Sequence, residues 1–302
     1  MHTVEWPDAR QIGPVTVLTG QDEGTYPHGN SVLVQGTRES VLLDPSLTVL
    51  ERGGAPRPVD RIVISHVHED HIPGHALFPD VPLHCHGADA PGLRSLEGLL
   101  DMFGFEGEMR ETFGQTMRSE FHFEPRASFT PFETGEVFDL GGVHIEVIHL
   151  PGHTRGHCAL RIPEAKAVFL GDIELTGFGP YYGDAWSDLE DFERSLVACR
   201  DIEAEHFITF HHKGTITGRD VFLEKLAAFE AVIQRREQRL LEFLAEPRTL
   251  AECAAHRIVF RPHVVKATID PIERRSIELH LERLARDGVV REVEAGRWQQ
   301  AR

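Results

Sequence analysis

The feature that most constrains this chain is the segment HVHEDH at residues 66–71, which directly follows the apolar run 61–65. A short run rich in β-branched residues predicts a buried strand, here ending at Ser65. Imidazole nitrogens and carboxylate oxygens are the donors that a borderline divalent cation such as zinc accepts. A lone His-x-His pair is common on protein surfaces, but the added Asp70, His71 and turn signal at 72–74 favour a metal site.

Further candidate ligands follow later apolar runs. Residues 145–150 precede His153, residues 167–170 precede Asp172, and residues 207–210 precede the pair His211 and His212. Each run predicts a strand, closed by a turn or directly by polar residues. Layered α/β folds gather polar residues at one edge of their sheets in this way. We therefore expect these side chains to converge with residues 66–71.

The motifs, taken together, resemble those of the metallo-β-lactamase superfamily: His-x-His-x-Asp-His, a later single His, a bridging Asp and a final His. They match, in this order, His66, His68, Asp70, His71, His153, Asp172 and one of His211 and His212. The match spans about the first 215 residues. The resemblance implies an α/β fold, an αββα sandwich. It also implies two metals, one on His66, His68 and His153, the other on Asp70, His71 and the final His, with Asp172 bridging.

The sequence offers two neighbouring candidates, His211 and His212, for the final ligand. Alignment without gaps against the family's usual strand and Pro-Gly-His ending places the ligand at His212. His211 then occupies a position where the family often has Gly. We therefore predict that His212 binds metal and that His211 lies behind it or contacts substrate in the mouth of the site.

Four further residues are candidates for supporting the site or contacting substrate. Asp44 ends the predicted strand 40–43 and either orients a ligand or only forms the strand-end turn. His157, close to His153, either supports a ligand or packs in the core. Tyr181 and Tyr182 belong to a Gly- and aromatic-rich loop just after Asp172, which suits substrate contact.

The chain divides into two predicted domains. Residues 1–217 form the catalytic domain, with an inserted helical segment at about 91–130 that either covers a pocket or packs on the sheet. From 218 to 302 the apolar spacing becomes helical, and three helices followed by a small hairpin resemble a winged-helix domain. The helix at 271–287 mixes charge signs, which favours a packing or dimerisation role over nucleic-acid binding, so a homodimer is one alternative.

The charge and composition of the chain indicate which binding partners and which cellular compartment to expect. The net charge is −17, and residues 219–302 carry 16 basic and 14 acidic residues, so the catalytic region is strongly acidic. Such a surface repels long polyanions unless a local basic path exists. The first residues lack the pattern of a signal peptide and no stretch is apolar enough for a membrane span, so we expect neither, and the 4 cysteines match no disulfide pattern. We expect a cytoplasmic protein with a small-molecule substrate and no membrane partner.

These observations predict a dinuclear metal-dependent hydrolase. A metal-bound hydroxide, oriented by the catalytic Asp70, would attack the carbonyl of a thioester, ester or lactone. The cofactor would be two divalent ions, zinc first, with iron and manganese as alternatives. No leaving-group acid is evident in the sequence, which favours a good leaving group such as a thiolate. The alternatives are a phosphodiesterase acting on RNA and an iron-bound redox or regulatory protein.

Overall fold

The computed structural model describes residues 4–212 and 214–301. Its first sheet has 7 strands in the order β1-β2-β3-β4-β5-β6-β7. Their bounds are β1 Arg10–Ile12, β2 Val15–Leu18, β3 Ser31–Gln35, β4 Ser40–Leu43, β5 Arg61–Val63, β6 Leu83–His86 and β7 Thr130–Phe132. Strands β1 to β4 pair antiparallel, and β4 to β7 pair parallel. The strand predicted before residue 66 is thus β5, a buried central strand.

The second sheet has 6 strands in the order β13-β12-β11-β10-β9-β8. Their bounds are β8 Val137–Asp139, β9 His144–His149, β10 Cys158–Ile162, β11 Ala167–Phe169, β12 His206–Ile208 and β13 Thr215–Thr217. Strands β11 and β12 run parallel, with Phe169 opposite Ile208. Their carboxyl ends therefore meet at one sheet edge, and the polar residues after each strand come together there.

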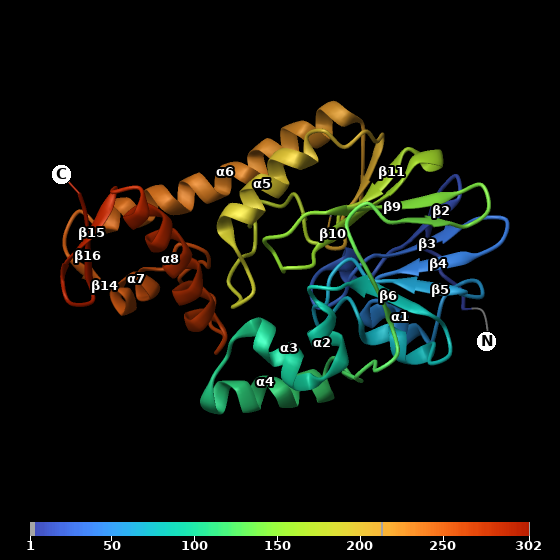
Figure 1. Ribbon diagram of the computed structural model, residues 1–302, viewed down its shortest axis with the longest axis horizontal. Coiled ribbons are helices and arrows are strands. Elements are labelled where there is room, and N and C mark those ends of the chain that lie inside the picture. The colour runs from blue at the N-terminus through green and yellow to red at the C-terminus, as the bar shows by residue number, and fades with distance from the viewer. Residues whose placement is uncertain (1–3, 213, 302) are drawn as a thin grey trace.

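Helices cover both outer faces of the paired sheets (Figure 1). The inner faces pack on each other through Val32, Val34, Val147, Leu160 and other buried side chains. Helix α1 Leu47–Arg52 and the inserted helices α2 Ala90–Arg94, α3 Leu96–Phe103 and α4 Gly107–Ser119 lie on the first sheet's side. Helix α5 Leu189–Cys199 and the first part of α6 Arg219–Phe243 lie on the second sheet's side. The predicted αββα sandwich is confirmed.

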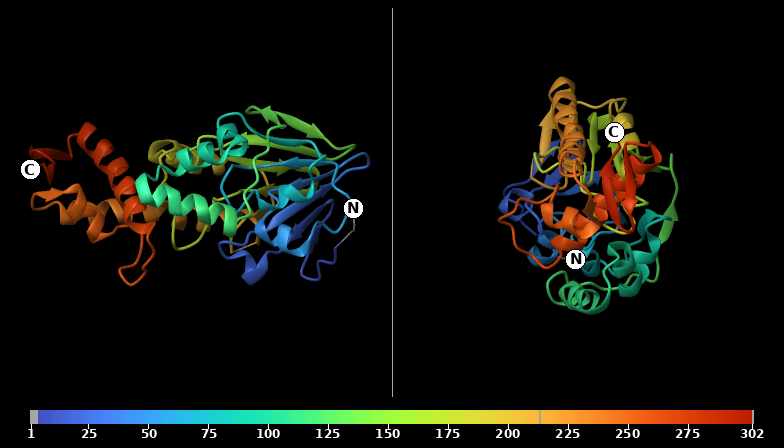
Figure 2. Two further views of the ribbon diagram at one scale, coloured as in Figure 1. Left: turned by 90° about the horizontal axis from the view of Figure 1, so that it is seen from below. Right: turned by 90° about the vertical axis from the view of Figure 1, so that its left-hand side faces the viewer.

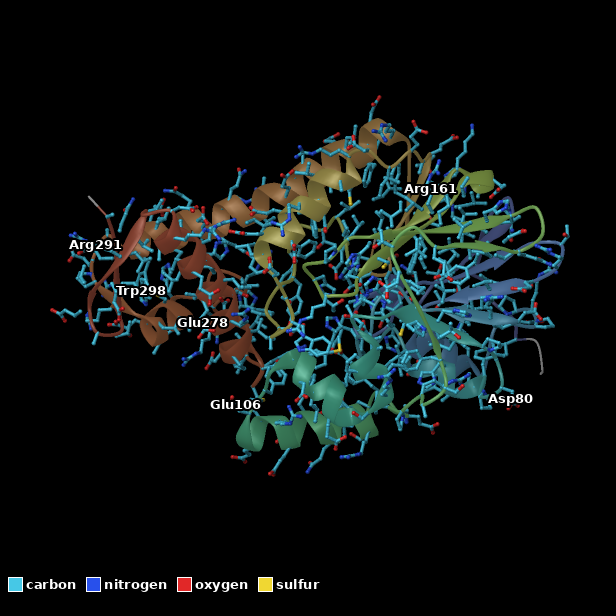
Figure 3. All side chains as sticks on the ribbon, viewed as in Figure 1. Asp80, Glu106, Arg161, Glu278, Arg291 and Trp298 are labelled. Atoms are coloured by element: carbon cyan, nitrogen blue, oxygen red, sulfur yellow. The ribbon has the colours of Figure 1, made fainter. Side chains whose placement is uncertain are left out.

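The chain's last part forms a separate unit at one end of the sandwich (Figure 2). It contains the end of α6, α7 Leu250–His256, α8 Ile269–Arg286 and a 3-stranded sheet of β14 Arg248–Thr249, β15 Val290–Glu294 and β16 Arg297–Gln300. Its own core joins Ile277, Leu281 and Leu284 of α8 to Leu240 and Leu244, and Trp298, labelled in Figure 3, packs against it. The winged-helix assignment of this unit stays a prediction.

The two units share an interface beside the inserted helices. Ile272, near the start of α8, belongs to the same buried cluster as Met102 and Phe103 of α3. Within the part of the chain that the structure describes, no helix has the length and apolar character needed to cross a membrane.

Candidate functional site

The first group of candidate ligands gathers around His66, just past the end of β5. Nε2 of His66 lies 3.2 Å from Nδ1 of His68 and 3.2 Å from Nε2 of His153. Nε2 of His153 lies 3.3 Å from Oδ2 of Asp172. All four side chains offer a ligand atom within 4.8 Å of one another. Three imidazoles and a carboxylate therefore share one point, as a cation-binding site requires.

The second group contains Asp70, His71 and His211. Nε2 of His211 lies 2.9 Å from Oδ2 of Asp70, and Nε2 of His71 lies 3.9 Å from Oδ1 of the same carboxylate. Both histidines are buried. The ligand atoms of this group also lie within 4.8 Å of one another, so it forms a second candidate metal position.

The sequence-based choice of His212 over His211 differs from the structure. His212 is exposed, and its Nδ1 lies 3.3 Å from the Thr25 hydroxyl. Its backbone φ is 53°, in the left-handed region. It lies in a turn whose ends are joined by a hydrogen bond from the Thr209 N–H to the Gly214 carbonyl at 2.8 Å. This turn directs His211, and not its neighbour, toward Asp70. Alignment by sequence position could not anticipate that bend.

Asp172 connects the two groups through its two carboxylate oxygens. Oδ2 faces His153, as described above, while Oδ1 lies 3.0 Å from Nε2 of His71. Although burial raises its pKa, the neighbouring His71 and His211 hold the pKa of Asp172 well below the usual value. The residue is therefore an ionised carboxylate with one oxygen on each group, which is the position predicted for a bridging ligand.

The outer ring nitrogens of these histidines face acceptors away from the centre. His153 Nδ1 donates to the Tyr181 carbonyl at 2.9 Å, and His211 Nδ1 donates to the Gly24 carbonyl at 2.9 Å. His71 Nδ1 lies 2.7 Å from Oδ2 of Asp44, and His66 Nδ1 lies 3.2 Å from the Ser65 hydroxyl. Such contacts fix the tautomer and leave the inner nitrogen free for a metal.

Unsatisfied atoms at the centre support a cation there. His71 Nε2, Asp70 Oδ2 and Asp172 Oδ1 are buried, and their short contacts described above lack the alignment of a hydrogen bond, so none of them has a hydrogen-bond partner among the described residues. Buried polar atoms are rarely left unpaired, because each costs roughly 1–3 kcal/mol. Burial and the neighbouring His71 also lower the pKa of His66, which keeps it in the neutral form that binds metal. The donor set thus fits one or two divalent cations.

His157 and Asp44 lie directly behind the candidate ligands. His157 Nε2 accepts the backbone N–H of Asp172 at 3.1 Å, and its Nδ1 donates to the Leu150 carbonyl at 3.0 Å. Burial, with the nearby His153, lowers the pKa of His157 to about 3, so the ring is neutral as this pattern requires. A side chain at Gly171, where φ is +55°, would meet His157 Nε2 at 2.7 Å, which explains the glycine before Asp172.

Asp89 and Asp184 support the site but were not singled out from the sequence. Asp89 accepts the N–H of Gly156 at 2.7 Å, the N–H of Val67 at 3.2 Å and the Thr154 hydroxyl at 2.6 Å, so it ties together the loops that carry His66, His68 and His153. Asp184 Oδ2 lies 3.2 Å from His68 Nε2, without the alignment of a hydrogen bond. Neither residue belongs to a local motif, so sequence spacing gave no signal for them.

Aromatic residues border the site. Phe103 of α3 stacks on His68 with 5.2 Å between ring centroids, and Phe121 lies 6.1 Å from the Tyr26 ring. The Tyr26 hydroxyl donates to Glu69 at 2.9 Å, and the Tyr26 ring lies 6.1 Å from His211. Burial and the adjacent Asp70 raise the pKa of Glu69 to about 7. The inserted helices therefore both pack on the sheet and border the centre.

The two tyrosines predicted near the site point in opposite directions. The Tyr181 ring lies 5.7 Å from His153, and its hydroxyl donates to Asp184 at 2.8 Å. Tyr182 is buried, and its hydroxyl lies 3.0 Å from Nε2 of His280 in α8. The structure therefore directs Tyr182 toward α8 and Tyr181 toward the candidate ligands, and a role of either residue in substrate contact stays a prediction.

Known proteins share this sequence pattern and fold. The family model of the metallo-beta-lactamase superfamily matches residues 24–212. The chain is 25% identical over 308 residues to an atrochrysone carboxyl ACP thioesterase of Pseudocercospora fijiensis, which covers 96% of this chain and 80% of that protein. It is 25% identical over 245 residues to the acyl-coenzyme A thioesterase MBLAC2 of Homo sapiens, and the match covers 70% of this chain and 84% of that protein. The crystal structure of a metallo-beta-lactamase family protein from Thermus thermophilus matches with a TM-score of 0.70 at 23% identity, covering 95% of this chain and 99% of that one.

Proposed function

Because this chain belongs to the metallo-beta-lactamase superfamily, we propose that it is a dinuclear metal-dependent hydrolase of small-molecule thioesters. The observation that carries the proposal is Asp172, whose Oδ2 faces His153 and whose Oδ1 faces His71. Two relatives named as thioesterases support the choice of substrate class.

The geometry supports the following ligand set. His66, His68 and His153 would hold one metal, and Asp70, His71 and His211 would hold the other, with Asp172 shared between them. Metals bound here would supply Lewis acidity toward a carbonyl oxygen and lower the pKa of water. Zinc suits these nitrogen and oxygen donors, and iron and manganese accept them as well.

The chain's own residues have separate tasks in this reaction. Asp70 lies among the candidate ligands, so its carboxylate can accept a hydrogen bond from the attacking water and orient it. Phe103, stacked on His68, and Phe121, beside Tyr26, exclude bulk water and so strengthen electrostatic interactions at the centre. Hydrolysis breaks the carbonyl–sulfur bond and releases a thiolate, which needs no protonation to leave.

Helix α8, the basic helix of the C-terminal unit, gives the nuclease alternative no support. The arginines of α8 are paired with carboxylates: Arg274 with Glu278, Arg275 with Glu282, Arg283 with Glu193 and Glu237, and Arg286 with Glu190. A helix that reads nucleic acid instead presents unpaired basic side chains to phosphates. Thioester hydrolysis therefore remains the proposal.

Metal analysis combined with a substrate panel tests this function. The protein loaded with zinc should release thiol from acyl-coenzyme A or from an acyl N-acetylcysteamine thioester. Activity should disappear with a chelator and return when zinc is added. A lactone and a short RNA complete the panel. Metal-dependent RNA cleavage without turnover of any thioester, ester or lactone would overturn the proposal.

A further inference from the structure

A cavity of about 530 Å³ lies outside the candidate metal site. Its walls come from α6, from the turn at 177–178 and from the segment 258–264 between α7 and α8. This volume falls within the roughly 300–1,000 Å³ typical of small-molecule pockets. We name it the α6 pocket, and neither the proposed metal ligands nor the aromatic mouth residues line it.

The α6 pocket is basic in an otherwise acidic protein. Its lining includes Arg235, Arg236, Arg239, Arg261 and His263 but no Asp or Glu, while the whole chain carries a net charge of −17. No described carboxylate lies within ion-pairing distance of these arginines, in contrast to the arginines of α8. The guanidinium groups of Arg235 and Arg261 also make no hydrogen bond with any described residue. These donors are therefore available to an anion.

The wall that carries Arg261 is held in place. The buried carboxylate of Glu273 accepts the backbone N–H groups of Ile258 at 2.9 Å, Val259 at 3.0 Å and Phe260 at 2.6 Å. Arg257 braces the rest of the segment by donating to the Val264 carbonyl at 2.8 Å. A pocket formed in advance binds its ligand at a lower entropic cost.

The opposite wall is fixed by Arg236, which is itself 2% exposed. Arg236 donates to the carbonyls of Pro180 at 2.5 Å and Phe178 at 2.7 Å. The rings of Phe178 and Phe260 lie 5.5 Å apart, and both line the cavity. The pocket thus combines guanidinium groups with aromatic faces, which suits a nucleotide with several phosphates.

Two connections join the α6 pocket to the metal centre. Phe178 follows Asp172 by six residues, and six extended residues span at most roughly 21 Å. On the other wall, Lys266 Nζ lies 5.8 Å from the centroid of the Tyr26 ring, which itself lies 6.1 Å from His211. The segment that lines the pocket up to Val264 therefore reaches the mouth of the site two residues later.

We propose that the α6 pocket binds the phosphates and adenine of a coenzyme A thioester while the acyl end lies at the metal centre. The inference rests on the proposed thioesterase function. The pantetheine arm would cross the gap between the two, and the chain from Asp172 to Phe178 limits the separation of these two residues to roughly 21 Å. A phosphopantetheine carried by a protein would present a single phosphate and no base, so the two unpaired arginines, Arg235 and Arg261, and the aromatic pair favour coenzyme A.

The test measures binding apart from hydrolysis. Adenosine 3′,5′-bisphosphate, which has neither thiol nor acyl group, is titrated calorimetrically into the metal-loaded protein. The double variant R235A/R261A should bind it at least about tenfold more weakly, because hydrogen bonds between charged partners are lost. The matched control R194A/R291A removes the same charge at exposed positions outside the pocket and should bind like the wild type; Arg291 is labelled at the outer end of the C-terminal unit in Figure 3.

Kinetics on two substrates complete the test. In R235A/R261A, KM for acyl-coenzyme A should rise about tenfold with kcat retained, while kcat/KM for the acyl N-acetylcysteamine thioester should not change. Equal affinity of the wild type and R235A/R261A for the bisphosphate would overturn the proposal, as would phosphopantetheine binding as tightly as coenzyme A. Arginine-dependent binding of the bisphosphate without hydrolysis of any thioester would support the pocket and refute the proposed function instead.

Discussion

The carboxylate of Asp44 lies 2.7 Å from Nδ1 of His71 and accepts the backbone N–H of Ser65 at 2.6 Å. One buried side chain thus fixes both the end of β5 and the ring that follows it. We expect Asp44→Asn to lower the affinity of the His71 position for metal by ~10–100-fold, as for other groups that orient metal-bound histidines. Competition with a chelator measures this. The exposed Asp139→Asn is the control, and unchanged affinity in Asp44→Asn would refute the orienting role.

His211 and His212 provide a matched pair for the second metal position. His211→Ala should lose that metal and nearly all activity, because Nε2 of His211 faces Asp70. His212→Ala should keep the metal and most activity, since its ring is exposed and lies against Thr25. Metal content by atomic emission, together with thioester turnover, distinguishes the two. Metal loss in His212→Ala alone would return the ligand to the position expected from the sequence.

Asp172 is the residue on which the two-metal arrangement depends. Asp172→Ala should lose at least one metal equivalent and nearly all activity, because both groups lose a carboxylate oxygen. The fold should survive, since the sandwich core does not include this side chain. Circular dichroism and metal content are measured on the same sample. Two retained metals with normal turnover would contradict the site assignment.

Replacing Asp89 should destabilise the fold. Its carboxylate accepts hydrogen bonds from Gly156, Val67 and Thr154, and it is fully buried. Asp89→Ala leaves these donors without a partner, so we expect a loss of roughly 3 kcal/mol or more in the free energy of unfolding. Urea denaturation in the presence of a chelator removes any contribution from metal. A loss below about 1 kcal/mol would show that the two loops do not depend on this tie.

A buried histidine, His280, connects the two units, and we expect it to make the stability of the protein depend on pH. His280 lies between the Tyr182 hydroxyl at 3.0 Å and Glu237 at 3.1 Å. Burial lowers the pKa of His280, although its hydrogen bond to Glu237 opposes this shift. A folded-state pKa below the unfolded value means that the unfolded chain binds protons more readily. The contribution of this contact to the free energy of unfolding is therefore fully present above about pH 6.5 and declines as the pH falls below that value.

The variant His280→Gln isolates this contribution. Urea midpoints are measured for the wild type and the variant between about pH 7.5 and about pH 5, which brackets the ordinary histidine pKa. The wild type should lose more stability than the variant over this interval, because both retain the same metal centre and only one titrates at position 280. Parallel pH profiles would show that His280 does not link the stability of the contact to pH.

Much of the candidate site could be predicted from the sequence, because most of its residues belong to short, contiguous motifs. A short apolar strand followed at once by polar residues, as at residues 61–71 and again at Asp172, determines both the ligand type and the sheet edge. The order of these motifs was also sufficient for the family resemblance. Asp89 and Asp184 were not accessible, because each acts through a contact with residues distant in the chain.

The sequence by itself determined the two layers of strands, the identity of most candidate ligands and their position after strand ends, since these depend on periodicity and on residue chemistry. Only the tertiary structure decided that His211 faces Asp70, that Tyr182 turns to α8 and that Arg235 and Arg261 line one pocket. The physical reason is that a side chain's direction in a turn depends on backbone dihedrals. Distant backbone hydrogen bonds help to set those angles, such as the one from the His212 N–H to the Gly24 carbonyl.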